Sequence, residues 1–284
     1  MKGRKKLIIL LGLLVILLIG AVLVVSLFRK DASYRKAEGL LQAGDSEGAY
    51  EAFLDLGAYK DSEEIVAGLL QKDPVLPFQT AHKGDIVTLG SYEQDDDPQN
   101  GKEAIEWIVL ERIENDMLLL SLTCLDCGVY NDAAFQPVTW EDSQIRHWLN
   151  KDFYSSAFSD REKGFVKLKS NQNLNQSLVN TKGGNSTQDH VFLLSEKESS
   201  VYIGNEMDQE YVGKASATEY AVAKGIHTDE GGYAEWWLRS PGSYEYTAQF
   251  VEAGGSPYVA GAYVDVIYGI RPAVWIDLKG DIEK

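Results

Sequence analysis

The chain of 284 residues is poor in the residues that most metal and redox sites require. It holds only 2 cysteines and 4 histidines. The cysteines form a single Cys-x-x-Cys pair, Cys124 and Cys127, which cannot supply the four ligands of a tetrahedral zinc site. A thioredoxin-type motif is also not indicated, because "GVYNDAAF" after the pair lacks a helical pattern. We expect either a small disulfide or two free thiols at a strand end.

Other signs of catalysis are missing as well. The four histidines show no His-Glu-x-x-His spacing, and neither a Walker loop nor a Gly-x-Ser-x-Gly elbow occurs. The stretch "DDDPQNG" places Gln99 and Asn100 where a calcium loop needs an oxygen ligand and its glycine, so a hairpin turn is predicted. The sequence therefore predicts no cofactor, no metal and no catalytic residue, and an enzymatic activity is not favoured.

Basic residues are scarce relative to acidic ones. Lys and Arg number 27 against 43 Asp and Glu, which gives a formal net charge of −16. Six of the basic residues lie among the first thirty, so the rest of the chain is still more acidic. This excess of negative charge argues against nucleic acid as a partner.

Residues 7–28 contain no charged side chain at all. A helix of this length measures about 33 Å, enough to cross a bilayer. Four basic residues precede the run and two follow it, which predicts a cytoplasmic tail at residues 1–6, a membrane span at 7–28 and an extracytoplasmic remainder. A cleaved signal peptide is the alternative, although its apolar region would be shorter and would end at a small-x-small site.

Amphipathic patterns with a break at "GDS" and a helix cap at "DSEE" predict short helices over residues 31–73. This segment resembles a tetratricopeptide-like helical hairpin. It covers little more than one repeat, so we expect a stalk or a packing partner. The two prolines of "KDPVLPF" mark a boundary, and all six tryptophans follow it, which predicts one domain at residues 80–284.

The predicted domain mixes strands with a few helices. The stretches "GDIVTLGSYEQ", "EAIEWIVLERI", "DMLLLSLTCL" and "HVFLLS" have strand patterns, and so do "WWLRS", "AQFVEA", "YVDVI" and "GIRPAVWI". "TWEDSQIRHWLNKDF" predicts a helix, with Thr139 and Asp142 at roughly the spacing of a capping box. Strands without regular alternation with helices predict the α+β class.

Seven stretches, "GDIVTLGSYEQ", "IEWIVLE", "YN", "TWEDSQIRHWLN", "FLLS", "WWLRSPG" and "GIRPAVWIDL", together resemble a bacterial domain family of unknown function. The family is common in anchored surface proteins, and the resemblance covers residues 82–278. It implies no activity, because the family has none assigned.

A Trp-Arg strand, a Gly-rich stretch and a Gly-x-Arg-Pro strand also resemble the C-type-lectin-like fold, which formylglycine-generating enzymes share. This resemblance implies a ligand surface built from C-terminal loops. The calcium-binding strings of sugar-binding lectins do not occur, and the cysteine pair lies too early for a formylglycine-generating enzyme. Neither chemistry is therefore expected.

The aromatic motifs divide into structural and binding candidates. Buried tryptophan and paired arginine are ordinary core features, so we expect structural roles for Trp148, Trp236, Trp237, Arg239, Arg271 and Trp275. The stretch between "WWLRSPG" and "GIRPAVWI" carries tyrosines among small residues, a composition suited to ligand recognition. The ligand-binding residues predicted there are Tyr244, Tyr246, Tyr258 and Tyr263.

Together these observations predict a membrane-anchored, extracytoplasmic binding module that recognises a glycan, a cell-wall fragment or a protein through its C-terminal loops. Two alternatives stay open. One is a divergent envelope-modifying enzyme, and the other is a scaffold that assembles through the helical hairpin.

Overall fold

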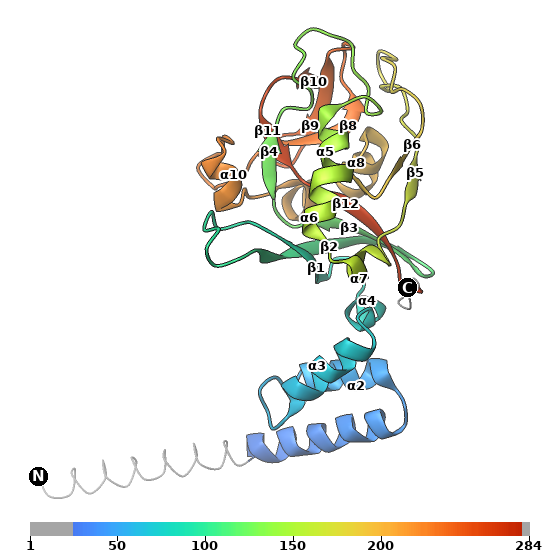
Figure 1. Ribbon diagram of the computed structural model, residues 1–284, viewed down its shortest axis with the longest axis vertical. Helices are drawn as coiled ribbons and strands as arrows, with labels where there is room; N and C mark the ends of the chain where they lie inside the picture. Colours follow the sequence, from blue (N-terminus) through green and yellow to red (C-terminus); the bar gives the residue numbers. More distant parts are fainter. Residues whose placement is uncertain (1–24, 280–284) are drawn as a thin grey trace, which may run out of the picture. The chain divides into compact units, whose positions relative to one another are not determined.

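The computed structural model describes residues 25–279 and divides the chain into two compact units, Met1–Thr80 and Ala81–Lys284 (Figure 1). Each unit is described by itself. Residues 1–24 lie outside the described part, and with them lie the expected tail at residues 1–6 and most of the expected span at residues 7–28.

The described residues correct the expected fold class. Within residues 25–279, no helix is long and apolar enough to cross a membrane. Charged side chains recur along the helical segment at residues 25–42 and make it too polar: Arg29, Lys30, Asp31, Arg35, Lys36 and Glu38. A transmembrane helix before the domain is therefore not supported by the described residues, and the cellular location that was expected from it stays an untested prediction.

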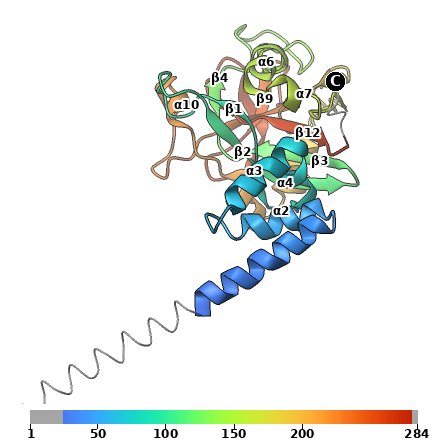
Figure 2. The same cartoon turned by 60° about the horizontal axis from the view of Figure 1, so that its bottom comes forward.

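The first unit is helical. Its helices are the segment at residues 25–42, α2 (Ser46–Leu54), α3 (Ser62–Lys72) and α4 (Leu76–Thr80), seen from below in Figure 2. Gly44 adopts φ +79° at the first break, a conformation that glycine takes without strain, and the carboxylate of Asp45 accepts a hydrogen bond from Gly48 N at 2.9 Å to cap α2. Burial of one face of each helix forms a small core of Tyr34, Ala37, Ala49, Tyr50, Phe53, Leu56, Leu69 and Leu76.

The second unit is a mixed α/β domain built on two five-stranded sheets. The first sheet is antiparallel throughout, in the order β1-β2-β3-β12-β7. Its strands are β1 (Ile86–Tyr92), β2 (Glu103–Ile113), β3 (Asp116–Ser121), β7 (Val191–Phe192) and β12 (Ala273–Asp277).

The second sheet has the order β10-β9-β8-β11-β4, and β8 and β11 are its one parallel pair in the described chain. Its strands are β4 (Asp126–Gly128), β8 (Trp236–Pro241), β9 (Thr247–Val251), β10 (Pro257–Tyr263) and β11 (Tyr268–Ile270). All residues of β8 and β9 are buried, so both faces of "WWLRS" lie in the interior.

The stretch "GIRPAVWI" was expected to be one strand, and the structure divides it. Ile270 ends β11 in the second sheet, whereas Ala273 begins β12 in the first sheet. Pro272, which has no N–H to donate to a ladder, lies between the two strands, and its carbonyl accepts a hydrogen bond from Ser121 N at 2.9 Å. The chain thus passes from one sheet to the other at Arg271–Pro272.

Short helices and a third, two-stranded sheet complete the domain. The small sheet pairs β5 (Lys169–Asn171) with β6 (Thr187–Asp189). The helices are α5 (Gln144–Trp148), η1 (Leu149–Phe153), α6 (Tyr154–Ala157), α7 (Asp160–Lys163), α8 (Glu196–Tyr202), α9 (Glu206–Asp208), η2 (Gln209–Gly213) and α10 (Glu219–Ala223).

The helix expected from "TWEDSQIRHWLNKDF" begins later than its sequence suggested. The N-cap is Ser143, whose hydroxyl accepts a hydrogen bond from Arg146 N, and α5 starts at Gln144. Thr139 and Asp142 instead bond to each other through their side chains at 3.4 Å. The predicted capping box is therefore wrong, because a serine next to the apolar face competes with it.

Candidate functional site

Three of the four tyrosines expected to bind ligand lie together at one end of the domain, and they are joined by a phenylalanine. We call Phe135, Tyr244, Tyr246 and Tyr263 the aromatic patch. The rings of Tyr244 and Tyr246 stack with centroids 5.5 Å apart and planes 3° apart, and Tyr263 lies 6.0 Å from Tyr246 at 17°. Phe135 packs 5.5 Å from Tyr246 and 5.2 Å from Tyr263.

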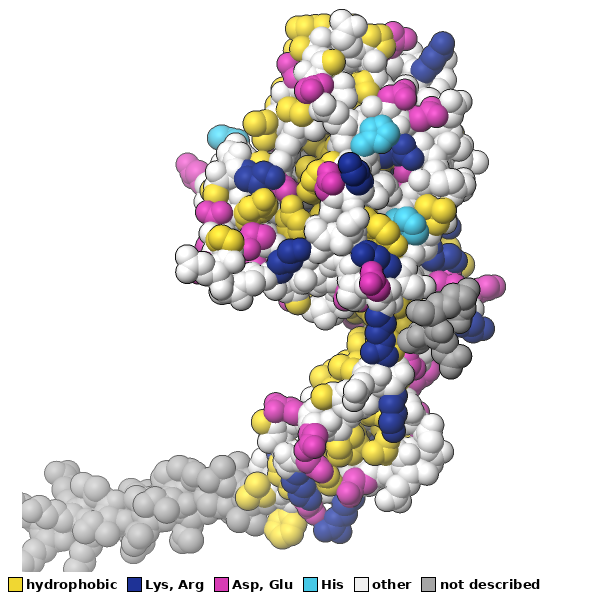
Figure 3. All heavy atoms as spheres, viewed as in Figure 1, with side chains coloured by type: hydrophobic (Ala, Val, Ile, Leu, Met, Phe, Trp, Pro, Cys, Tyr) yellow, Lys and Arg dark blue, Asp and Glu magenta, His cyan; other side chains and the backbone are white. Residues whose placement is uncertain are grey.

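The patch faces outward. Tyr244 is 61% exposed, Tyr263 50% and Phe135 63%, while Tyr246 is half-buried between them. Figure 3 shows hydrophobic side chains at the end of the domain where β10 and the loop before α5 lie. Parallel rings at these centroid distances are offset, so part of each ring face stays uncovered.

Backbone contacts between three segments hold the patch in place. Val138 N donates to the carbonyl of Glu245 at 2.9 Å and so ties the Phe135 loop to the turn between β8 and β9. Ser243 N donates to the carbonyl of Ala260 at 2.8 Å, which ties the same turn to β10. A Cβ on Gly242 would lie 2.6 Å from that carbonyl oxygen and 2.4 Å from Thr247 Oγ1, so only glycine permits this approach.

The fourth predicted tyrosine lies apart from the patch. Tyr258 is opposite Phe250 in the β9–β10 ladder, and the two rings are 5.2 Å apart. A register shift between Tyr258 and Ala262 separates its surroundings from those of Tyr263. Tyr258 is 45% exposed, but the structure does not bring it together with the other three tyrosines.

The residues of "WWLRSPG" are buried. Trp236 and Trp237 are both fully buried, and their ring N–H groups donate to the carbonyls of Gly213 at 2.8 Å and Gly128 at 3.0 Å. Arg239 is 4% exposed, and its Nη1 donates to the carbonyl of Leu193 at 2.7 Å and to Glu198 at 2.5 Å. This arginine thus meets both a backbone carbonyl and a carboxylate.

The residues of "GIRPAVWI" also lie in the interior. Arg271 is fully buried, and its guanidinium donates to the carbonyls of Ser121 at 2.7 Å, of Leu122 at 3.4 Å and of Val212, and lies 4.9 Å from the Trp236 ring. Burial lowers the pKa of Arg271 to about 10.

The last two tryptophans that were expected to be structural lie in different surroundings. Trp275 is 7% exposed and carries Lys169 Nζ over its ring at 4.4 Å. Trp148 is half-buried, and its ring packs 5.5 Å from that of Phe153.

The cysteine pair consists of two free, buried thiols. Burial raises the pKa of Cys124 to about 12, and it also raises that of Cys127. Cys127 Sγ donates to the carbonyl of Ala221 at 3.4 Å. A thiol in such a setting carries little thiolate at neutral pH and behaves as a packing residue.

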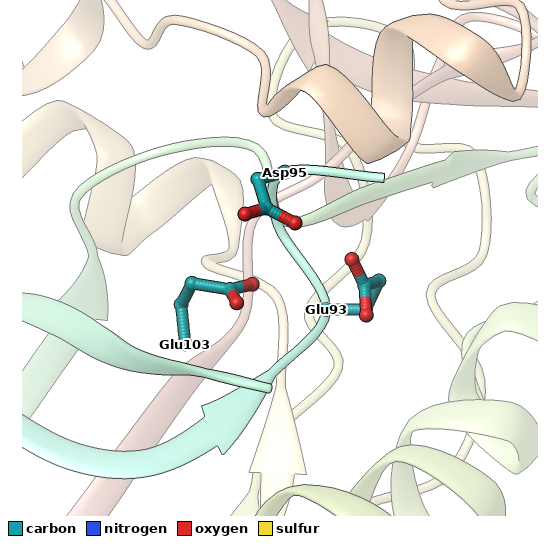
Figure 4. A group of neighbouring side chains, drawn as sticks. All are labelled: Glu93, Asp95 and Glu103. Carbon is teal, nitrogen blue, oxygen red and sulfur yellow. The ribbon is translucent and has the colours of Figure 1, made fainter. Parts of the chain in front are cut away.

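Three carboxylates lie together where β1 and β2 meet, and they are the described residues best able to hold a metal ion. Glu93, Asp95 and Glu103 each place an oxygen within 4.8 Å of the others (Figure 4). Asp95 accepts a hydrogen bond from the Asn100 amide at 2.7 Å, and Glu103 accepts one from Gln94 N at 2.7 Å. Two of the three groups thus close the hairpin turn, and we assign no metal to them.

Comparison with known proteins identifies a family for most of the domain. A family model described as "Domain of unknown function (DUF6273)" matches residues 114–278, which include the whole aromatic patch. No curated protein and no solved structure matches the chain significantly. The expected likeness to C-type lectins and formylglycine-generating enzymes is therefore unsupported, and the fold is described by its two sheets alone.

Proposed function

The chain belongs to the DUF6273 family of domains of unknown function, and from the geometry of its aromatic patch we propose that the domain is a glycan-binding module. The observation that carries the proposal is the outward-facing cluster of Phe135, Tyr244, Tyr246 and Tyr263. The ligand is a hydroxyl-rich chain that lies across these rings.

The chemistry of the patch suits such a ligand. The face of an aromatic ring carries partial negative charge, and it attracts the polarised C–H groups on the flat side of a sugar ring. Within residues 25–279, the phenol hydroxyls of Tyr244, Tyr246 and Tyr263 make no hydrogen bond, so they are available to sugar hydroxyls. Apolar contact and hydrogen bonding thus come from the same side chains.

The exposure of the patch argues against a purely structural role. A core aromatic would gain free energy by burying its ring, whereas Phe135, Tyr244 and Tyr263 leave half or more of theirs in water. Contiguous exposed apolar surface on a folded domain commonly marks an interaction site. The enzyme and scaffold alternatives stay predictions from the sequence.

Binding of soluble chito-oligosaccharides to the full-length protein tests the proposal. Each ring contact contributes about 0.5–1.5 kcal/mol, so Tyr244→Ala, Tyr246→Ala and Tyr263→Ala should each weaken affinity by about 2-fold to 10-fold. Tyr211→Ala is the matched control, because Tyr211 is 72% exposed and lies on η2 outside the patch.

Two outcomes would contradict the proposal. One is wild-type affinity in all three patch variants. The other is retention of a pool of unrelated peptides, but not of the oligosaccharides, by the wild-type protein. The second outcome would make the patch a protein-binding surface.

A further inference from the structure

The domain contains a cleft of about 760 Å³, whose lining includes none of the patch residues. Its walls come from β5 and the chain after it, from α8, from Arg239 on β8 and from Trp275 on β12. We call it the α8 cleft. Its volume lies within the range of small-molecule sites. Arg239 of "WWLRSPG" and Trp275 of "GIRPAVWI" both line this cleft.

Two of the three acidic groups in the lining already have several hydrogen-bond donors. The carboxylate of Glu196 accepts hydrogen bonds from Gln249 Nε2 at 2.8 Å and from Ser177 N and Oγ. Glu198 accepts hydrogen bonds from Ser195 N at 2.7 Å and from Ser195 Oγ at 2.8 Å, and it forms an ion pair with Arg239. The side chain of Glu198 is therefore already paired within the domain. Glu111 differs from both, because the hydroxyl of Tyr202 is its single donor and no cation pairs with it among the described residues.

Two basic groups of the cleft lack an acidic partner. Lys169 lies over the ring of Trp275, and Lys197 is exposed; neither forms an ion pair within residues 25–279. In addition, Arg239 Nε is buried and has no hydrogen-bond partner in the described part of the chain. Buried donors normally find a partner, so this one indicates a water molecule or a ligand atom.

Unpaired groups of both signs thus line one space in a strongly acidic chain. From this arrangement we propose that the α8 cleft binds a short peptide with free ends, with its carboxylate at Lys169 and Lys197 and its ammonium group at Glu111. Charge-assisted hydrogen bonds of this kind are the stronger ones in proteins. The proposal is independent of the glycan-binding function.

A neutral sugar fits the cleft less well. It would leave the unpaired charges of Lys169, Lys197 and Glu111 without counter-charges. The one tryptophan of the lining is 7% exposed and its ring already carries Lys169 Nζ, so it offers little free face for stacking.

Thermal unfolding of the full-length protein with three equimolar pools of synthetic tripeptides tests the proposal. The pools have free ends, acetylated amino ends or amidated carboxyl ends. Only the free-end pool should raise Tm strongly, because each blocked pool loses one charged contact and binds about 10-fold to 100-fold more weakly.

Three variants assign the contacts. In the Lys169→Gln/Lys197→Gln variant, the free-end and amidated pools should raise Tm by the same amount. In the Glu111→Gln variant, the free-end and acetylated pools should raise Tm by the same amount. Lys182→Gln, which replaces an exposed lysine outside the lining, is the control and should behave as the wild type.

Three results would overturn the proposal. The first is no stabilisation of cooperatively folded wild-type protein by the free-end pool. The second is equal stabilisation by the free-end pool in the double lysine variant and in the wild type. The third is stabilisation by neutral chito-oligosaccharides that disappears in the double lysine variant, which would make the cleft a sugar site.

Discussion

Replacing Arg271 by lysine should destabilise the domain although the positive charge is kept. The guanidinium reaches three carbonyls, those of Ser121, Leu122 and Val212, and it stacks 4.9 Å from Trp236. A lysine ammonium lacks the planar fork that serves several directions at once, so at least one buried carbonyl loses its donor. Hydrogen bonds to charged groups contribute about 1.5–3 kcal/mol each, so we expect the free energy of unfolding to fall by at least about 1.5–3 kcal/mol.

Urea unfolding followed by tryptophan fluorescence measures this loss. All six tryptophans lie between residues 107 and 275, so the signal reports the second unit. Lys182→Arg, at an exposed position of the second unit, is the control and should change stability by less than about 0.5 kcal/mol. If Arg271→Lys lowered the free energy of unfolding by less than about 1 kcal/mol, the planar guanidinium would not be what stabilises the segment that joins the two sheets.

The remaining predictions concern groups with shifted pKa values. Burial acts to raise the pKa of Glu198, but the charge of Arg239 and the hydrogen bonds from Arg239 and Ser195 outweigh it and hold this pKa below its ordinary 4.5. The ion pair with Arg239 therefore stabilises the domain fully at pH values above the ordinary glutamate pKa, and this stabilisation is lost as pH falls through the lowered pKa of Glu198. Glu198→Gln should cost about 2–3 kcal/mol of unfolding free energy at pH 7 and less in acid. An equal cost at pH 7 and in acid would contradict this. Because burial raises their pKa values, Cys124 and Cys127 should react only slowly with a thiol reagent in the native protein. Both should react after denaturation without reductant. If no thiol reacted after denaturation, the two cysteines would form a disulfide.

The sequence could predict elements whose pattern is local. The strand character of "WWLRS" and "AQFVEA" follows from β-branched and aromatic residues, and the strands β8 and β9 lie there. Which sheet a strand joins depends on contacts between residues far apart in the chain. The division of "GIRPAVWI" at Arg271–Pro272 between two sheets therefore could not be predicted from the sequence.

The candidate site was predictable only in part. Tyrosines among glycines indicated Tyr244, Tyr246 and Tyr263, but Phe135 comes from a loop more than one hundred residues earlier and joins them only through tertiary contacts. Tyr258 shares their composition, yet the register shift in β10 places it against Phe250. The α8 cleft had no local signal, because it combines residues from five separate segments.

Titration of chito-oligosaccharides into the full-length protein and into a Tyr244→Ala/Tyr246→Ala/Tyr263→Ala variant tests the central claim most directly. Since three ring contacts together contribute about 1.5–4.5 kcal/mol, we predict saturable binding to the wild type and an affinity at least 10-fold lower in the variant, which still unfolds cooperatively in the absence of ligand. Equal affinity in the two proteins, or no binding to folded wild-type protein, would contradict it.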